Sequence, residues 1–138
     1  MILAKTTEYA LTVLGFMATR NEALYPAEYL HQKLHIPRQY LRRLLTDLSK
    51  LGYIRSSKGR NGGFVFNQDL KEINFYNIIN AMEGPDAMKT CLLGFSCCIA
   101  DRPCVMHNTW TEARSKMIEA LTNTSLADLK EKYLLDQE

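Results

Sequence analysis

A leucine-striped helix and a basic hairpin follow one another in residues 37–63, which read PRQYLRRLLTDLSKLGYIRSSKGRNGG. Five leucines recur at helical spacing, and Gly52 is placed to end the helix that they define: Leu41, Leu44, Leu45, Leu48 and Leu51. Residues 53–57 and 64–66 are short strand-like runs on either side of a glycine-rich turn. The stretch therefore predicts a helix followed at once by a β-hairpin.

Two further helices are predicted before this stretch. Apolar residues at i, i+3, i+4 and i+7, beginning at Ala10, indicate an amphipathic helix from Lys5 to Thr19. Pro26 suits the first turn of a second, short helix, and Ile36-Pro37 separates it tightly from the third. Three helices and a hairpin in this order predict a mainly α fold, a winged helix-turn-helix whose wing is the small β-hairpin.

The rest of the chain predicts helices around a cysteine-rich segment. Asn74 can cap a fourth helix that Gly84-Pro85 ends. A helix of about 20 residues is expected from Pro103 onward, with a near-heptad seam typical of a long C-terminal dimerisation helix: Met106, Trp110, Ala113, Met117 and Leu121. A Ser125/Asp128 capping box opens a last short helix. We expect residues 1–84 to form the DNA-binding region and residues 85–138 the sensor loop and dimerisation helices, within one integrated domain.

Composition is that of an ordinary globular domain. The 138 residues are 46% hydrophobic and 23% charged, which excludes intrinsic disorder and collagen-like structure. The first 20 residues resemble neither a signal peptide nor a membrane span, so a reducing bacterial cytoplasm is the expected compartment, with nucleoid association when the protein is bound to DNA. Four cysteines nevertheless fall within 14 residues, at positions 91, 97, 98 and 104. Such clustering favours a metal or redox site over scattered structural thiols.

Positive charge is concentrated in the helix and hairpin of the opening stretch. Residues 38–60 hold seven basic side chains and one acidic one, a net charge of +6, so the remainder of a chain with total charge +2 carries −4. The basic residues of the helix avoid its leucine stripe, and Arg and Gln are the side chains that pair with guanine and adenine in the major groove. Basic residues on a glycine-rich hairpin can approach phosphates or the minor groove.

This placement predicts binding to double-stranded DNA, whereas a winged helix used for protein contacts is the alternative. The candidate DNA-binding residues are Arg38, Gln39, Tyr40, Arg42 and Arg43 of the helix, and Ser57, Lys58, Arg60, Asn61 and Gly62 of the hairpin. A dimer would read two half-sites one helical turn apart.

Together these motifs resemble the IscR/NsrR-type family of bacterial winged-helix transcription regulators. The resemblance covers nearly the whole chain and rests on residues 9–11 (YAL), on Tyr40-Leu41, on the wing sequence GRNGG of residues 59–63, and on the cysteine loop followed by Trp110. It implies a homodimer with an iron-sulfur cluster, 2Fe-2S with 4Fe-4S as the alternative, that senses redox, iron or nitric oxide status and sets operator affinity as a repressor or activator.

The resemblance also implies the cluster ligands. Cys98 and Cys104 have the spacing that the family commonly shows, so Cys91, Cys98 and Cys104 are the expected thiolate ligands and Cys97 is the alternative. His107 is the expected fourth ligand. Glu8, contributed by the partner subunit, competes with His107 for that role.

Two other functions of the same cysteines are possible. A Cys₃His set could hold zinc, and neighbouring thiols could act as a cluster-free redox switch in the same kind of winged-helix regulator. We expect no enzyme, because the sequence has no P-loop, GxSxG or HExxH motif.

Overall fold

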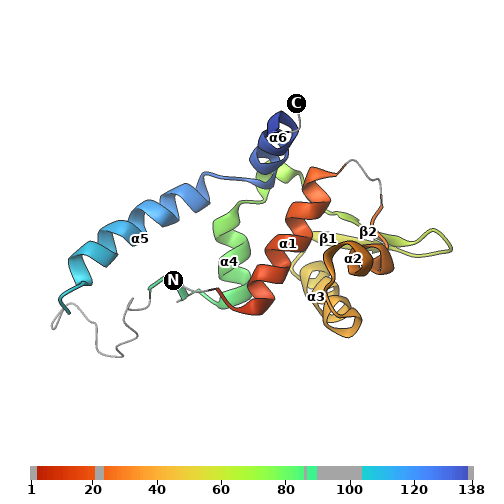
Figure 1. Cartoon of the computed structure of the whole chain (residues 1–138), viewed down its shortest axis with the longest axis horizontal. Coiled ribbons are helices and arrows are strands. Elements are labelled where there is room, and N and C mark those ends of the chain that lie inside the picture. The colour runs from red at the N-terminus through yellow and green to blue at the C-terminus, as the bar shows by residue number, and fades with distance from the viewer. Residues whose placement is uncertain (1–2, 21–23, 86, 90–103, 137–138) are drawn as a thin grey trace.

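The structure is a computed structural model that describes residues 3–20, 24–85, 87–89 and 104–136 (Figure 1). Its elements in chain order are α1 (Lys5–Thr19), α2 (Ala27–Leu34), α3 (Arg38–Lys50), β1 (Ile54–Ser57), β2 (Gly63–Phe66), the 3₁₀ turn η1 (Leu70–Glu72), α4 (Phe75–Glu83), the 3₁₀ turn η2 (Ala87–Lys89), α5 (His107–Thr122) and α6 (Leu126–Asp136). The winged helix-turn-helix prediction is confirmed, and α1 and α3 lie where the sequence pattern placed them.

One hydrophobic core joins the N-terminal helices to the last helix. Four leucines of the predicted stripe turn inward and are almost fully buried in a cluster that includes Leu14 of α1: Leu41, Leu44, Leu45 and Leu48. Leu51, the fifth, lies at the C-cap of α3 and is 43% exposed. Leu126 at the start of α6 is also fully buried in this cluster, and α6 lies against α1 (Figure 1). Burying a leucine side chain stabilises a fold by roughly 1.5–3 kcal/mol. The core therefore holds α3 rigidly and presents its opposite face outward.

The turn between α2 and α3 is fixed by two histidines. His35 caps α2 in the left-handed conformation, with φ 57° and ψ 31°. The Nδ1 atom of His31 lies 2.6 Å from the carbonyl oxygen of Ile36, whose side chain is buried. This short connection sets the angle at which α3 leaves α2.

The wing is anchored to the chain just before α2. β1 and β2 pair antiparallel from Ile54 opposite Phe66 to Ser57 opposite Gly63. Tyr25 adds a third backbone contact, exchanging hydrogen bonds of 2.8 and 2.9 Å with Phe64. A Cβ atom on Gly63 would lie 2.8 Å from the backbone of Tyr25, so only glycine permits this approach.

The two predicted caps are confirmed. The Asn74 side chain accepts a hydrogen bond of 2.8 Å from the backbone of Asn77 at the start of α4. The Ser125 hydroxyl and the Asp128 carboxylate cap the start of α6 reciprocally, because Asp128 accepts from the Ser125 backbone at 2.8 Å and Ser125 accepts from the Asp128 backbone at 3.3 Å.

Helix α5 is shorter than predicted and stands apart from the core. It begins at His107 and has 16 residues rather than about 20, because Cys104–Met106 form a turn that the His107 amide closes on the Cys104 carbonyl at 3.0 Å. None of its residues is buried, and Figure 1 shows it running from α6 past α4 and away from the body. In the part of the chain that the structure describes, no helix is both long and apolar enough to cross a membrane.

Candidate nucleic-acid interface and cysteine segment

The outward face of α3 is polar and accessible along its length. Four buried leucines occupy the inner stripe, and five side chains on the opposite face are exposed: Arg38, Gln39, Arg42, Arg43 and Thr46. The Thr46 hydroxyl donates to the Arg42 carbonyl at 2.9 Å. A helix with this composition can lie in the major groove and present guanidinium and amide groups to base edges.

Arg38, at the start of α3, is held by an acid on α2. Its Nε and Nη2 atoms donate to the two carboxylate oxygens of Glu28, at 2.9 and 2.6 Å. The Arg38 hydrogen bond holds the pKa of the Glu28 carboxyl below its ordinary value, and the same bond raises the pKa of Arg38. Both groups are therefore charged at neutral pH, and the pair links the two helices of the helix-turn-helix.

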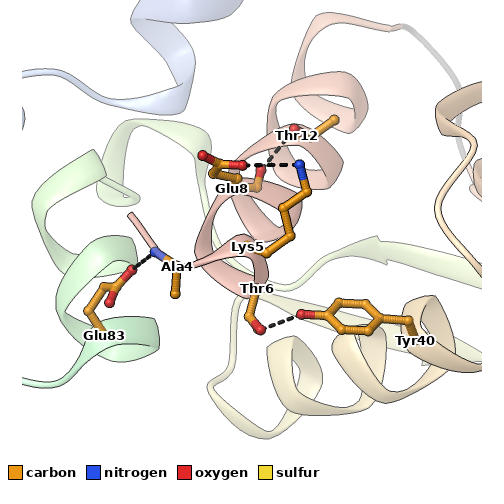
Figure 2. Close-up of polar contacts among 7 residues, drawn as sticks. All are labelled: Ala4, Lys5, Thr6, Glu8, Thr12, Tyr40 and Glu83. Atoms are coloured by element: carbon orange, nitrogen blue, oxygen red, sulfur yellow. Dashed lines mark hydrogen bonds and ion pairs between the residues drawn. The ribbon is translucent and has the colours of Figure 1, made fainter. Parts of the chain in front are cut away.

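Tyr40 faces α1 as well as the recognition surface. Its hydroxyl forms a hydrogen bond with the Thr6 hydroxyl (Figure 2), and its ring meets the ring of Tyr9 edge-on with centroids 5.2 Å apart. Lys5 lies over the other ring of this pair, 5.1 Å from the Tyr9 centroid. The first turn of α1 thus sets the position of the first turn of α3.

The wing tip carries the second group of predicted DNA-binding residues. Ser57, Lys58, Arg60 and Asn61 are exposed and Gly62 is half-buried. Figure 1 shows the hairpin reaching outward beyond α2 and α3. A backbone φ of 120° at Gly59 lets the chain turn back within the tip. The tip and the α3 face are thus two separate basic surfaces that a single duplex could contact.

The structure describes part of the predicted ligand set. Cys91, Cys97 and Cys98 lie outside the described residues. Cys104 and His107 are both half-buried and share the turn that opens α5. Among the described residues, no three His, Cys, Asp or Glu side chains come together as a metal site.

Glu8 lies in the first turn of α1, on a different part of the molecule. Its side chain is 49% exposed and pairs with Lys5 at 3.4 Å (Figure 2). The start of α5 lies well away from α1 in Figure 1. Within one protomer, then, the structure does not bring Glu8 to Cys104 and His107.

Three connections were not predicted from sequence. They are the ion pair between Glu28 and Arg38, the bridge from Tyr25 to the wing, and a hydrogen bond of 2.6 Å from the Ala4 amide to the Glu83 carboxylate (Figure 2). Opposite charges on helices that flank a tight turn were the available signal for the first. Nothing in the local sequence indicates the other two.

Comparison with known proteins identifies the family. The family model described as Rrf2, "Iron-dependent Transcriptional regulator", matches residues 3–132. The chain belongs to the Rrf2 family. It is therefore a transcription regulator of the DNA-binding helix-turn-helix class, and the resemblance to IscR and NsrR is confirmed by relatives that carry those names.

Relatives of this Rrf2 protein match over nearly its whole length. The transcriptional regulator NsrR of Bacillus licheniformis is 29% identical, over 94% of this chain and 92% of the relative. The transcriptional regulator IscR of Serratia proteamaculans is 28% identical, over 94% of this chain and 79% of the relative. Both relatives are named as transcriptional regulators of the helix-turn-helix type.

Solved structures show that the Rrf2 fold is shared. CymR, titled the global cysteine regulator of B. subtilis, superimposes with a TM-score of 0.79 at 23% identity, covering 96% of this chain and 98% of CymR. IscR of T. potens superimposes with a TM-score of 0.73 at 20% identity, covering 100% of this chain and 89% of that one.

Proposed function

We propose that this Rrf2 protein is a homodimer whose affinity for an operator is controlled by an iron-sulfur cluster, 2Fe-2S in the first instance and 4Fe-4S as the alternative. The observation that carries the proposal is the turn before α5, which brings Cys104 close to His107, the first residue of a helix in which no residue is buried. The cluster would be held by Cys91, Cys98 and Cys104, with His107 or Glu8 of the partner subunit as the fourth ligand.

The donor chemistry of the described residues fits such a group. A cysteine thiolate and a histidine imidazole are ligands that iron-sulfur clusters accept, and both side chains here are half-buried rather than enclosed in the core. When bound, a cluster supplies a centre whose oxidation state and stability respond to oxygen, nitric oxide or iron supply. The protein's part is to hold that centre at one end of α5.

The exposed seam of α5 supports the homodimer. Met117 on this seam is 50% exposed, and no residue of the 16-residue helix is buried within the protomer. Covering the exposed half of this methionine contributes roughly 0.7–1.5 kcal/mol, so a second copy of α5 along the seam would be a stabilising neighbour. Glu8 is distant from the start of α5 in its own protomer, so in this proposal it would approach Cys104 and His107 from a second copy of the chain.

A chain of contacts supports coupling between the cysteine segment and the DNA-binding face. Glu83 ends α4, shortly before the cysteine segment, and its carboxylate accepts from the Ala4 amide that precedes α1. Thr6 in the first turn of α1 bonds to Tyr40 of α3. A displacement of the end of α4 would therefore reach the recognition helix through the first turn of α1 (Figure 2). In a dimer, a shift of the two recognition helices changes their fit to two half-sites.

DNA would be read by α3 and contacted by the wing. Arg42 and Arg43 extend from the exposed face of α3, and Lys58 and Arg60 from the wing tip. The N-terminal region 1–84 then carries the DNA contacts and residues 85–138 the sensor and dimer contacts, although α6 shares the core of α1. A zinc site or a cluster-free thiol switch at the same cysteines is the second candidate function, which the Cys₃His donor set would also permit.

Anaerobic purification followed by metal and sulfide analysis tests this proposal. We expect coloured protein with iron and acid-labile sulfide in equal amounts, at two of each per protomer for a 2Fe-2S cluster. Cys98→Ala should abolish the colour, whereas its neighbour Cys97→Ala, the matched control, should keep it. Colourless protein that contains zinc or no metal would overturn the cluster and favour the second candidate.

The fourth ligand is assigned by a second pair of variants. His107→Ala should shift the visible absorption and electron paramagnetic resonance spectra if His107 is the ligand, while Glu8→Gln leaves them unchanged. The reverse result would place Glu8 of the partner subunit at the cluster.

A further inference from the structure

A paired acid lies beside the first residue of the recognition helix. Glu28, the second residue of α2, accepts both the Nε and the Nη2 hydrogen bonds of Arg38, at 2.9 and 2.6 Å. Arginine and carboxylate form a bidentate ion pair here, called the fork below. This geometry fixes the plane of the guanidinium as well as its distance from the carboxylate.

The pair belongs to the proposed DNA-binding surface. Arg38 and Arg42 are one helical turn apart on the exposed face of α3, and both border a shallow hollow that Glu28 and His31 also line. The side chains of Glu28 and Arg38 remain 50% and 60% exposed, so the fork is accessible to a ligand. An acid at this place would repel phosphates if it were unpaired, which makes its pairing relevant to DNA binding.

The fork determines which edge of Arg38 remains available. A guanidinium offers a side edge, made by Nε and Nη2, and an end edge, made by Nη1 and the second Nη2 hydrogen. Glu28 occupies the side edge. The end edge can still donate two parallel hydrogen bonds, the pattern with which arginine binds guanine or a phosphate.

We propose that Glu28 is a positioning residue for sequence recognition, which holds the Arg38 guanidinium so that its end edge meets one defined base pair or phosphate. This inference rests on the proposed DNA-binding role of α3. Pre-organisation lowers the cost of ordering a flexible side chain on binding. Glu28 thereby favours the correct site and, through its negative charge, disfavours DNA that gives Arg38 no partner.

An ion pair that only links α2 to α3 would behave differently. Removing such a pair would destabilise the helix-turn-helix and weaken binding to every DNA sequence by the same factor. Releasing an oriented arginine would change the ratio between binding to the correct site and binding to random DNA, because a free arginine still attracts phosphates. The specificity ratio is therefore the informative quantity.

The experiment compares Glu28→Gln with wild type on two duplex probes. One is a 30-bp duplex selected by the wild-type protein from a randomised library, and the other is the unselected random pool, both measured by fluorescence anisotropy at several salt concentrations. We expect Glu28→Gln to lower the ratio of the two affinities by about fivefold or more, without weakening binding to the random pool. Glu112→Gln is the matched control, since it removes an equal charge from an exposed ion pair with Lys116 on α5 and should leave the ratio unchanged.

A second variant separates orientation from charge. Arg38→Lys keeps the positive charge but has no fork, so it should lower the specificity ratio in the same direction, and adding Glu28→Gln to it should lower the ratio no further. An unchanged ratio in Glu28→Gln, or an equal loss on both probes, would overturn the positioning role. Failure of the wild-type protein to select any sequence would instead refute the proposed recognition of DNA and this inference with it.

Discussion

Neutralising three exposed cations should remove most of the salt dependence of DNA binding. Arg42 and Arg43 lie on the outer face of α3 and Lys58 lies at the wing tip. None of the three belongs to the core or to an ion pair that the structure records. Replacing all three by Gln should therefore leave the fold intact and change only the interaction with DNA.

The magnitude follows from counterion release. Each cation that neutralises a phosphate contributes about 0.9 to the slope of log affinity against log salt. A dimer on two half-sites carries six of these cations, so the triple variant should lower that slope by about 5.4. Between 50 and 200 mM salt, the fold-loss of affinity should then be about 1,800 times smaller for the variant than for the wild type. At low salt its absolute affinity should be much weaker, because the contacts themselves are lost.

The assay is fluorescence anisotropy of a labelled duplex titrated with protein at four or more salt concentrations. A control variant with Gln at Lys71, Lys116 and Lys132 loses the same formal charge from η1, α5 and α6. Light scattering and thermal melting check that both variants keep the wild-type assembly and stability. The assignment of α3 and the wing as the DNA-binding surface would be refuted if the variant at Arg42, Arg43 and Lys58 kept the wild-type slope of log affinity against log salt. It would also be refuted if both variants lowered that slope equally.

Three further changes test the elements that position this surface. Tyr40→Phe removes the hydroxyl contact with Thr6 but keeps the ring on Tyr9, so the free energy of unfolding should fall by about 0.5–1.5 kcal/mol in denaturant titrations, and a loss below that range would show that the contact is not formed. Gly63→Ala places a Cβ atom 2.8 Å from the Tyr25 backbone, which should cost about 1–3 kcal/mol and weaken duplex binding, whereas unchanged melting and binding would contradict the close packing of the wing. Burial raises the pKa of Tyr53 above its ordinary value, so stability that is fully present below about pH 10 should decline as the unfolded chain ionises at higher pH. Tyr53→Phe should flatten that alkaline decline in melting temperature, and an identical decline in both proteins would argue against the shift.

Much of the fold was predictable because the deciding signals are local and periodic. The leucines of α3 recur at the spacing of an α-helix and so define one apolar face, and the glycines of the wing mark a single turn. The start of α5 was placed too early, because the near-heptad seam begins at Met106 whereas the backbone closes a turn over Cys104–Met106 first. Spacing identifies the face of a helix but not the position of its first turn.

The site was less predictable because its side chains are positioned by distant parts of the chain. Tyr40 lies between an outward Gln39 and an inward Leu41, and periodicity alone cannot decide that its hydroxyl meets Thr6. Arg38 was expected to be a DNA contact from its position on α3, but its two hydrogen bonds to Glu28 depend on how α2 and α3 pack, which residue spacing does not reveal. The roles of Cys91, Cys97 and Cys98, which lie outside the described residues, stay predictions.

The most direct test of the central claim is the duplex affinity of one anaerobic preparation before and after its iron is removed by a chelator. We expect cluster-loaded and cluster-free protein to differ at least about fivefold in affinity for the selected 30-bp duplex, the lower end of a typical allosteric coupling. Cys98→Ala should show no difference after the same treatment, whereas Cys97→Ala should respond as wild type does. Equal affinities of the loaded and cluster-free wild-type protein would contradict control of DNA binding by the cysteine segment.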